Sequence, residues 1–420
     1  MEDKIKILTI SDHPLSPSGV GIQTRYMIEA LLKTGRYKVV SLGGAIKHQD
    51  YTPKKLEEWG DDWIIFPVDG YGGADVVRSV VRNERPDMLW FMTDPRFFAW
   101  LWQMEDEVRP LMPLMYYHVW DNYPPPTFNK PYYDSNDSIV AISKVTHDIV
   151  SNIVDKTDTI YHPHSVDTNI FKKLDDAEIL KFRRASFPDE KDDDRMLFFW
   201  NNRNARRKQS GTLIFWFKEF LDRVGHNSAR LVMHTDPFDQ HGQNLEMIIK
   251  ELNLNEGQVL LSTQKIPPQD MSVLYNIADC TINISDAEGF GLSTLESLAC
   301  ETPIIVNMTG GLQEQVTDGE SWFGIGLEPS SKSLIGSQDI PWIFEDRLNR
   351  EEFIDALEKF YNLSKTERGK MGADGRSHVM KNYNFESYQS NWVKIIDEAV
   401  EKFGSWDNRK NYKTWSIEQL

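Results

Sequence analysis

Short apolar segments alternate with longer amphipathic segments along most of the chain, and this alternation predicts the fold. Short apolar segments of this kind suit strands buried in a parallel sheet. Strands are expected at 4–11, 37–42, 63–68, 88–92, 114–117, 138–143, 196–200, 230–235, 258–261 and 280–284. Because a crossover follows these strands, the pattern predicts an α/β fold with doubly wound parallel sheets.

The segments between the strands place apolar residues at helical spacing. In the segment 212–224, for example, apolar residues stand at positions 213, 216, 217, 220 and 221, on one face of a helix. Helices are expected at 74–83, 96–107, 144–153, 212–224, 244–252, 268–277, 292–299, 350–363 and 365–381, with a last one from 383. The pattern loosens between 321 and 346, a stretch rich in Trp, Gly, Pro and Ser.

Composition limits the number of domains and the classes of partner that are expected. A chain of 420 residues with 40% hydrophobic residues is expected to form two domains of roughly 150 to 200 residues. A formal charge of −17 disfavours unspecific attraction to nucleic acid or anionic lipid. The start shows no signal-peptide pattern and no run reaches membrane-spanning length, so the protein is expected to be soluble and cytoplasmic. The two cysteines, Cys280 and Cys300, suggest neither a disulfide framework nor a metal cluster.

A glycine-rich turn follows the strand expected at 280–284. Gly289 and Gly291 lack a Cβ, so backbone N–H groups can point out of the turn at the start of the helix 292–299. Such a helix start attracts phosphate. A second anion-binding turn is expected at 310–311, at the start of another helix.

Two carboxylates flank this turn. Glu288 lies in the turn and Glu296 about one and a half turns along the helix, so both can face one cleft. They would repel phosphate but can accept hydrogen bonds from sugar hydroxyls, one from a transferred sugar and one from a ribose. The segment Glu-Gly-Phe-Gly-Leu-Ser-Thr-Leu-Glu, with the Gly-Gly turn after it, resembles the donor-site signature of family 4 of the retaining glycosyltransferases, which have the GT-B fold.

The resemblance implies site residues in this half. Glu288 would be a catalytic residue that anchors the transferred sugar. The donor-binding residues would be Gly289, Phe290, Gly291, Leu292 and Glu296, with Ile266 near the base. An alternative interpretation of this segment is an acidic glycine loop of some other Rossmann-like protein.

A basic loop follows the strand at 196–200. Arg203 and Lys208 have the spacing of the family's Arg and Lys that hold the donor diphosphate, which guanidinium groups bind bidentately and ammonium groups as point charges. Both are therefore predicted to be catalytic. For Arg206 and Arg207 a solvated basic turn is the simpler interpretation.

The first half resembles the family less. Gly19 and Gly21 match its amino-terminal glycine loop, which approaches donor and acceptor, although a plain tight turn is the alternative. His118 ends a predicted strand, where ligands bind in open α/β sheets, and it matches a histidine that the family places near the transferred sugar. It is predicted to be catalytic, with Trp120 and Asp121 as acceptor-binding candidates. A structural hydrogen-bonding histidine is the alternative.

The resemblance also implies the domain organisation: two Rossmann-like domains that face each other across a cleft, and a C-terminal helix that crosses back to the first domain. We expect an acceptor-binding domain at 1–165, a donor-binding domain at 166–382, and the returning helix with a polar tail at 383–420. The long connection at 321–346 is expected to cover the nucleotide or to serve the acceptor.

The resemblance implies that the protein transfers a sugar, expected to be a hexose, from a UDP-, GDP- or ADP-sugar to a hydroxyl group. Transfer would retain the anomeric configuration by front-face attack. The basic loop and glycine amides would neutralise the leaving diphosphate, so neither metal nor cofactor is expected. The acidic run 192–194 is most simply a solvated loop.

The acceptor, whether glycan, lipid, protein, small molecule or modified nucleic-acid base, stays open. A nucleotide-sugar epimerase or hydrolase, and a non-catalytic sugar-nucleotide-binding protein, are the alternatives.

Overall fold

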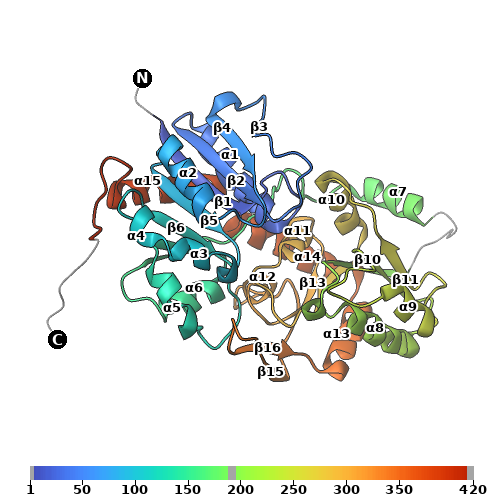
Figure 1. Cartoon of the computed structure of the whole chain (residues 1–420). Coiled ribbons are helices and arrows are strands. Elements are labelled where there is room, and N and C mark those ends of the chain that lie inside the picture. Colours follow the sequence, from blue (N-terminus) through green and yellow to red (C-terminus); the bar gives the residue numbers. More distant parts are fainter. Residues whose placement is uncertain (1–3, 188–194, 414–420) are drawn as a thin grey trace. The chain divides into compact units, whose positions relative to one another are not determined.

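A computed structural model describes residues 4–187 and 195–413 and divides the chain into two compact units. The first unit comprises Met1–His164, Gly336–Pro341 and Glu386–Leu420, and the second comprises Ser165–Ile335 and Trp342–Phe385. Each unit contains its own mainly parallel sheet (Figure 1). The acidic run 192–194, for which the sequence suggests a solvated loop, lies outside the described residues.

The first unit is built on an eight-stranded sheet in the order β3-β4-β2-β1-β5-β6-β7-β8, parallel except at β3. Its strands are β1 (Ile5–Asp12), β2 (Tyr37–Gly44), β3 (Lys54–Lys55), β4 (Trp63–Pro67), β5 (Met88–Met92), β6 (Leu114–His118), β7 (Ser138–Ala141) and β8 (Asp158–Tyr161). Every residue of β5, β6 and β7 is buried, as expected for strands covered on both faces. The chain order reverses at β1, which pairs with both β2 and β5.

Helices connect these strands. They are α1 (Gly19–Lys33), α2 (Ala74–Glu84), α3 (Ala99–Trp102), α4 (Glu105–Val108), α5 (Lys130–Asp134), α6 (Lys144–Ser151) and α15 (Phe385–Phe403), with 3-10 turns η1 (Gly60–Asp62), η2 (Pro95–Phe97) and η3 (Thr127–Asn129). The single helix predicted at 96–107 is wrong. The chain leaves the helical backbone region at Phe98 and Met104, whose side chains turn into the core instead of continuing a regular helix.

The C-terminal helix α15 packs into the first unit, as the predicted fold class requires. Trp392 is fully buried and meets Trp90 and Tyr117 edge to face, with ring centroids 5.9 and 4.8 Å apart. Asp397 accepts two hydrogen bonds from Arg36, at 2.9 and 2.7 Å. The helix is thus part of the core of the first unit.

The second unit contains a six-stranded, all-parallel sheet in the order β11-β10-β9-β12-β13-β14. Its strands are β9 (Met196–Asn201), β10 (Ala229–His234), β11 (Val259–Ser262), β12 (Cys280–Asn283), β13 (Ile304–Asn307) and β14 (Gly324–Leu327). The chain order reverses between β9 and β12, which are neighbours in the sheet. Such a reversal is where open α/β sheets bind ligands, beyond the carboxyl ends of the strands.

Helices flank this second sheet. They are α7 (Asp176–Ser186), α8 (Ser210–Val224), α9 (Leu245–Glu251), α10 (Pro268–Ile277), α11 (Leu292–Ala299), α12 (Leu312–Val316), α13 (Arg350–Asn362) and α14 (Lys365–Asn382), with the 3-10 turn η4 (Arg206–Lys208). Phe198 of β9 packs against Phe217 and Phe220 of α8 in the core of this unit. No helix among the described residues combines the length and hydrophobicity needed to span a membrane.

A two-stranded antiparallel hairpin forms in the stretch where the sequence pattern loosens. It consists of β15 (Ser331–Ile335) and β16 (Ile343–Arg347), which lie side by side in Figure 1. No residue of β15 is fully buried, so the alternating apolar pattern by which a strand is found in a sequence is weak there. The sequence pattern predicts no element at this place.

Candidate functional site

Two loops meet at the reversal point of the second sheet. The first, 202–209, follows β9, and the second, 284–291, follows β12. A backbone hydrogen bond of 2.8 Å joins them, from the N–H of Asp286 to the carbonyl of Arg207. The fold therefore holds the two loops, which carry predicted site residues, next to each other.

A buried ion pair connects these loops. The Lys208 ammonium donates to the Glu288 carboxylate, and the two side chains are only 9% and 11% exposed. Asn283 donates to the same carboxylate oxygen at 3.3 Å. Burial alone would raise the pKa of Glu288, but the charges of Lys208 and Arg207 outweigh it and lower the pKa below its usual value. Glu288 is thus an ionised acceptor at neutral pH.

The glycine loop and the Gly-Gly turn pack tightly against each other. A Cβ on Gly311 would lie 2.6 Å from the Cα of Phe290, a contact that backbone atoms cannot relieve. Gly291, at φ +93°, adopts a left-handed conformation that favours glycine, and it directly precedes helix α11 as its N-cap. The Gly311 N–H donates to the Glu288 carbonyl at 3.1 Å. The second glycine turn therefore fixes the first.

The second carboxylate of the motif has a different environment. Glu296, on α11, accepts a hydrogen bond of 2.7 Å from the hydroxyl of Tyr275, which in turn accepts one of 2.9 Å from Asn201. Burial raises the pKa of Glu296 to about 7, against a smaller lowering effect of Tyr275. Its environment is that of an acid which titrates near neutral pH.

Each of the three arginines of the basic loop makes an ion pair or a hydrogen bond with another segment. Arg203 donates to both oxygens of Asp239, at 2.6 and 3.2 Å, while its own side chain is 61% exposed. Arg206 pairs with Glu345, and Arg207 donates to the carbonyl of Ala287. The solvated basic turn expected for Arg206 and Arg207 holds in part: the Arg206 side chain is 58% exposed and Arg207 is half-buried, but both also tie this loop to neighbouring segments.

The remaining predicted donor residues lie in different settings. Phe290 is 2% exposed and packs edge to face on Tyr383 with ring centroids 5.7 Å apart, so its side chain supports the loop from inside. Leu292 is the first residue of α11 and is half-buried. Ile266 is half-buried in the loop between β11 and α10.

The predicted residues of the first unit gather at two strand ends. Gly19 and Gly21 begin α1, where Ser18 accepts from the Gly21 N–H at 3.0 Å and donates to Asp12 at 2.6 Å. A Cβ on Gly21 would lie 2.7 Å from the carbonyl oxygen of His13, so close packing explains this glycine.

His118 is fully buried at the end of β6. Its Nε2 lies 2.7 Å from the hydroxyl of Tyr133, and burial lowers its pKa to about 3. Trp120 is 5% exposed and donates to the Asn122 carbonyl at 2.8 Å, while Asp121 is half-buried. A neutral, enclosed imidazole is the environment of a core residue, and the role of His118 at a transferred sugar stays a prediction.

Several residues at the site were missed by sequence reasoning. Asn283 and Tyr275 orient the two glutamates, and Asp239 orients Arg203. Asn283 could have been found from its place at the end of a strand next to the glycine turn. Asp239 belongs to the loop after β10, and only the order of the strands brings it to Arg203.

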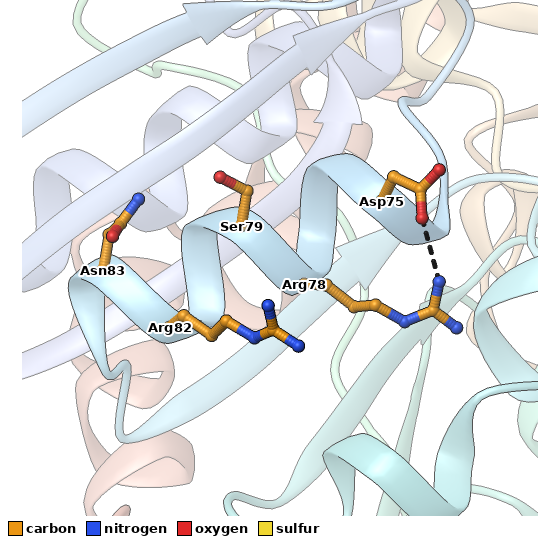
Figure 2. Close-up of a pocket in the computed structure, with 5 residues that line it drawn as sticks. All are labelled: Asp75, Arg78, Ser79, Arg82 and Asn83. Atoms are coloured by element: carbon orange, nitrogen blue, oxygen red, sulfur yellow. Dashed lines mark hydrogen bonds and ion pairs between the residues drawn. The ribbon is translucent and has the colours of Figure 1, made fainter.

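The described residues contain no group of three or more His, Cys, Asp or Glu side chains that could hold a metal ion. Figure 2 shows a pocket in the first unit whose five labelled side chains, Asp75, Arg78, Ser79, Arg82 and Asn83, all come from helix α2. Arg78 is paired with Asp75 and with Glu107, at 2.9 and 2.7 Å. This pocket shares no residue with the predicted donor site.

Comparison with known proteins gives matches to both sequence and fold. Residues 182–377 match the family described as glycosyl transferases group 1. A D-inositol 3-phosphate glycosyltransferase of Corynebacterium jeikeium is 31% identical over 132 residues, which are 30% of this chain and 31% of that protein. The matched region thus spans about a third of the length of this curated relative.

Two solved structures match nearly the whole chain. Sucrose-phosphate synthase from Thermosynechococcus elongatus gives a TM-score of 0.75 at 16% identity, over 95% of this chain and 100% of that one. The Anabaena protein HepE in complex with UDP and glucose gives 0.68 at 16% identity, over 94% and 100%. These likenesses confirm the predicted fold class, a GT-B arrangement of two Rossmann-like parallel sheets.

Proposed function

We propose that this chain, whose residues 182–377 belong to the glycosyl transferases group 1 family, moves a sugar from a nucleotide diphosphate sugar to an acceptor hydroxyl. The observation that carries the proposal is the buried Lys208–Glu288 pair at the reversal point of the second sheet, next to a glycine loop that starts a helix. This arrangement combines a cation for phosphate, backbone N–H groups and an ionised acceptor for sugar hydroxyls.

The proposed roles follow from these environments. Lys208, Arg203 and the N–H groups around Gly289–Gly291 stabilise charge that grows on the diphosphate as the glycosidic bond breaks. Glu288, kept ionised by Lys208, anchors hydroxyls of the transferred sugar. Glu296 accepts hydrogen bonds from the ribose. Gly19, Gly21 and His118 of the first unit, with Trp120 and Asp121, serve the donor and the acceptor from the other domain.

The finer features are also part of the proposal. Transfer retains the anomeric configuration by front-face attack, in which the leaving phosphate takes the proton of the acceptor hydroxyl. No divalent ion is needed, because the side chains above neutralise the diphosphate. The enzyme acts in the cytoplasm. Activity that is lost on chelation and restored by a divalent ion would contradict metal independence.

The comparisons suggest where the donor and acceptor search should begin. The HepE structure holds UDP and glucose, and the curated relative is named for D-inositol 3-phosphate. UDP-sugars are therefore the first donors to test, followed by GDP- and ADP-sugars, and phosphorylated polyols are the first acceptors. Incubation of the donor without an acceptor separates transfer from epimerisation, which would yield a new nucleotide sugar.

The decisive variant is Glu288→Gln. The amide keeps the size of the side chain but lacks the charge that accepts sugar hydroxyls, so transfer is expected to fall by about a hundredfold or more. Nucleotide binding, measured by the rise in melting temperature, should persist. Glu351→Gln is the matched control, because Glu351 is 53% exposed on α13. Unchanged turnover of Glu288→Gln would refute the proposed role.

A further inference from the structure

Strand β16 places two charged side chains on one face. Glu345 and Arg347 are two residues apart in a strand, so their side chains point to the same side. Their shared contact is an ion pair of 2.8 Å between them. Both also reach residues of the loops at the donor site.

Glu345 binds the loop that follows β9. Its two carboxylate oxygens accept from the two terminal nitrogens of Arg206, at 2.9 and 2.5 Å. The Glu345 side chain is 4% exposed, and a carboxylate at this depth is stable only when it is paired and hydrogen-bonded. Arg206 is two residues before Lys208, in the same 3-10 turn. The strand therefore holds the turn that carries the proposed phosphate-binding lysine.

Arg347 binds the loop that follows β12. Its guanidinium donates to the carboxylate of Asp286, which is 4% exposed and also accepts from the side-chain amide of Gln209 at 2.6 Å. Burial raises the pKa of Asp286 to about 6, against lowering effects of Gln209 and Arg347. Asp286 is two residues before Glu288, so the strand also holds the loop that carries the proposed sugar anchor.

Backbone and side-chain contacts of Asp346 complete the attachment. Its N–H donates to the Asp286 carbonyl at 2.9 Å, and its carboxylate accepts from the hydroxyl of Thr309 at 2.7 Å. Thr309 precedes the Gly-Gly turn after β13. One strand of the hairpin thus contacts the loops after β9, β12 and β13, which all start at the carboxyl edge of the sheet.

We propose that Glu345 and Arg347 are positioning residues of the donor site, and that strand β16 holds Lys208 and Glu288 in the geometry that binds a nucleotide diphosphate sugar. The proposal rests on the proposed function of that site. Binding groups must be fixed within fractions of an ångström to be effective, and two ion pairs with buried carboxylates, one to each loop, supply that constraint. This gives the hairpin in the long connection a role in the site.

The test compares donor affinity in Arg347→Met, Glu345→Gln and wild type. The probe is whichever of UDP-glucose, GDP-mannose and ADP-glucose stabilises the wild-type protein most. We expect the dissociation constant to rise about tenfold or more in Arg347→Met. Arg350→Met is the matched control, because Arg350 lies 51% exposed at the start of α13 and should bind the probe like wild type. A merely structural role would reduce the folded fraction, and hence the number of binding sites, while the affinity of the folded protein stayed constant.

A double-mutant cycle with Asp286→Asn tests whether Arg347 affects donor affinity through Asp286. If Arg347 acts through Asp286, the double variant Arg347→Met/Asp286→Asn should bind the probe no more weakly than the weaker single variant. Additive losses in affinity would overturn that route. Glu345→Gln keeps the shape of the side chain and provides the measurement if Arg347→Met does not fold.

Failure of this inference is distinguishable from failure of the proposed function. A wild-type protein that binds none of the three nucleotide sugars overturns the proposed function and the inference together. A wild-type protein that binds one of them, with unchanged dissociation constants in Arg347→Met and Glu345→Gln, overturns the inference alone.

Discussion

Raising the pH from 6 to 8 should strengthen the binding of an intact nucleotide sugar about tenfold. The reason lies in Glu296, the proposed ribose acceptor, which must be ionised to accept hydrogen bonds from two hydroxyls. Burial raises its pKa to about 7, and its hydrogen-bond donor, Tyr275, is neutral. At pH 6 roughly one molecule in eleven would carry the ionised form, and at pH 8 roughly ten in eleven. This ratio corresponds to about 1.4 kcal/mol of binding free energy.

Because the pKa of Glu296 is raised, the folded protein becomes less stable as the pH rises, whereas donor binding becomes stronger. An acid whose pKa is higher in the folded than in the unfolded chain holds its proton more tightly when folded. Between the usual value of 4.5 and about 7, the folded state therefore binds more protons, and its free energy of unfolding falls as the pH rises. Glu296→Gln should remove this slope, so that stability changes less between pH 4.5 and pH 7 in the variant than in wild type.

The assay is isothermal titration calorimetry with a UDP-sugar from pH 5.5 to 8.5. An intact nucleotide sugar is preferable to UDP, whose terminal phosphate titrates near pH 6. Asp286, with a pKa of about 6, titrates in the same range, so the relevant quantity is the difference between wild type and Glu296→Gln. Tyr275→Phe removes the bond that lowers the pKa of Glu296 and should shift the midpoint to higher pH. A wild-type affinity independent of pH, or a slope that persists in Glu296→Gln, would refute the reasoning.

Two further predictions concern the packing that supports the site and the fold. Gly311→Ala should weaken donor binding and lower the free energy of unfolding by about 1–3 kcal/mol, because the added Cβ would meet backbone atoms of Phe290. The control is Gly369→Ala on α14, where an added Cβ meets nothing within 4 Å, so this variant should be as stable as wild type or more stable. Urea unfolding measures both. Trp392→Ala should lower the free energy of unfolding by about 3–5 kcal/mol through the cavity left against Trp90 and Tyr117, and a loss below about 1 kcal/mol would contradict the placement of α15 in the core.

The buried strands and the glycine motif could be predicted from the sequence because their signals are local. The strand expected at 88–92 and the helices at 268–277 and 292–299 have the same bounds in the structure. Helix α7 was missed because none of its residues is buried, so it lacks the apolar stripe by which helices are found. Strand β8 was missed for a related reason, since its side chains are half-buried or exposed.

The partners of the site residues could not be predicted, because they come from distant parts of the chain. Arg206 and Glu345 are 139 residues apart, and Arg347 and Asp286 are 61 apart. Nothing in the local sequence around Arg206 indicates the buried Glu345 carboxylate with which it pairs. Because no strand is predicted at 343–347, the placement of Glu345 and Arg347 on one face could not be predicted either.

The two glutamates of the motif have opposite electrostatic environments, although they are separated by only seven residues. Glu288 faces the ammonium of Lys208 and stays ionised across the neutral range, whereas Glu296 faces a phenol and titrates near pH 7. Groups whose environments move their pKa values apart are suited to different tasks. Glu288, as the proposed acceptor for the transferred sugar, has to be charged throughout turnover. Glu296, as the proposed ribose acceptor, becomes charged only when it loses its proton, so it makes the affinity for the donor depend on pH. The pH dependence of binding would therefore report on the nucleoside end of the donor, and substitution of Glu288 on the sugar end.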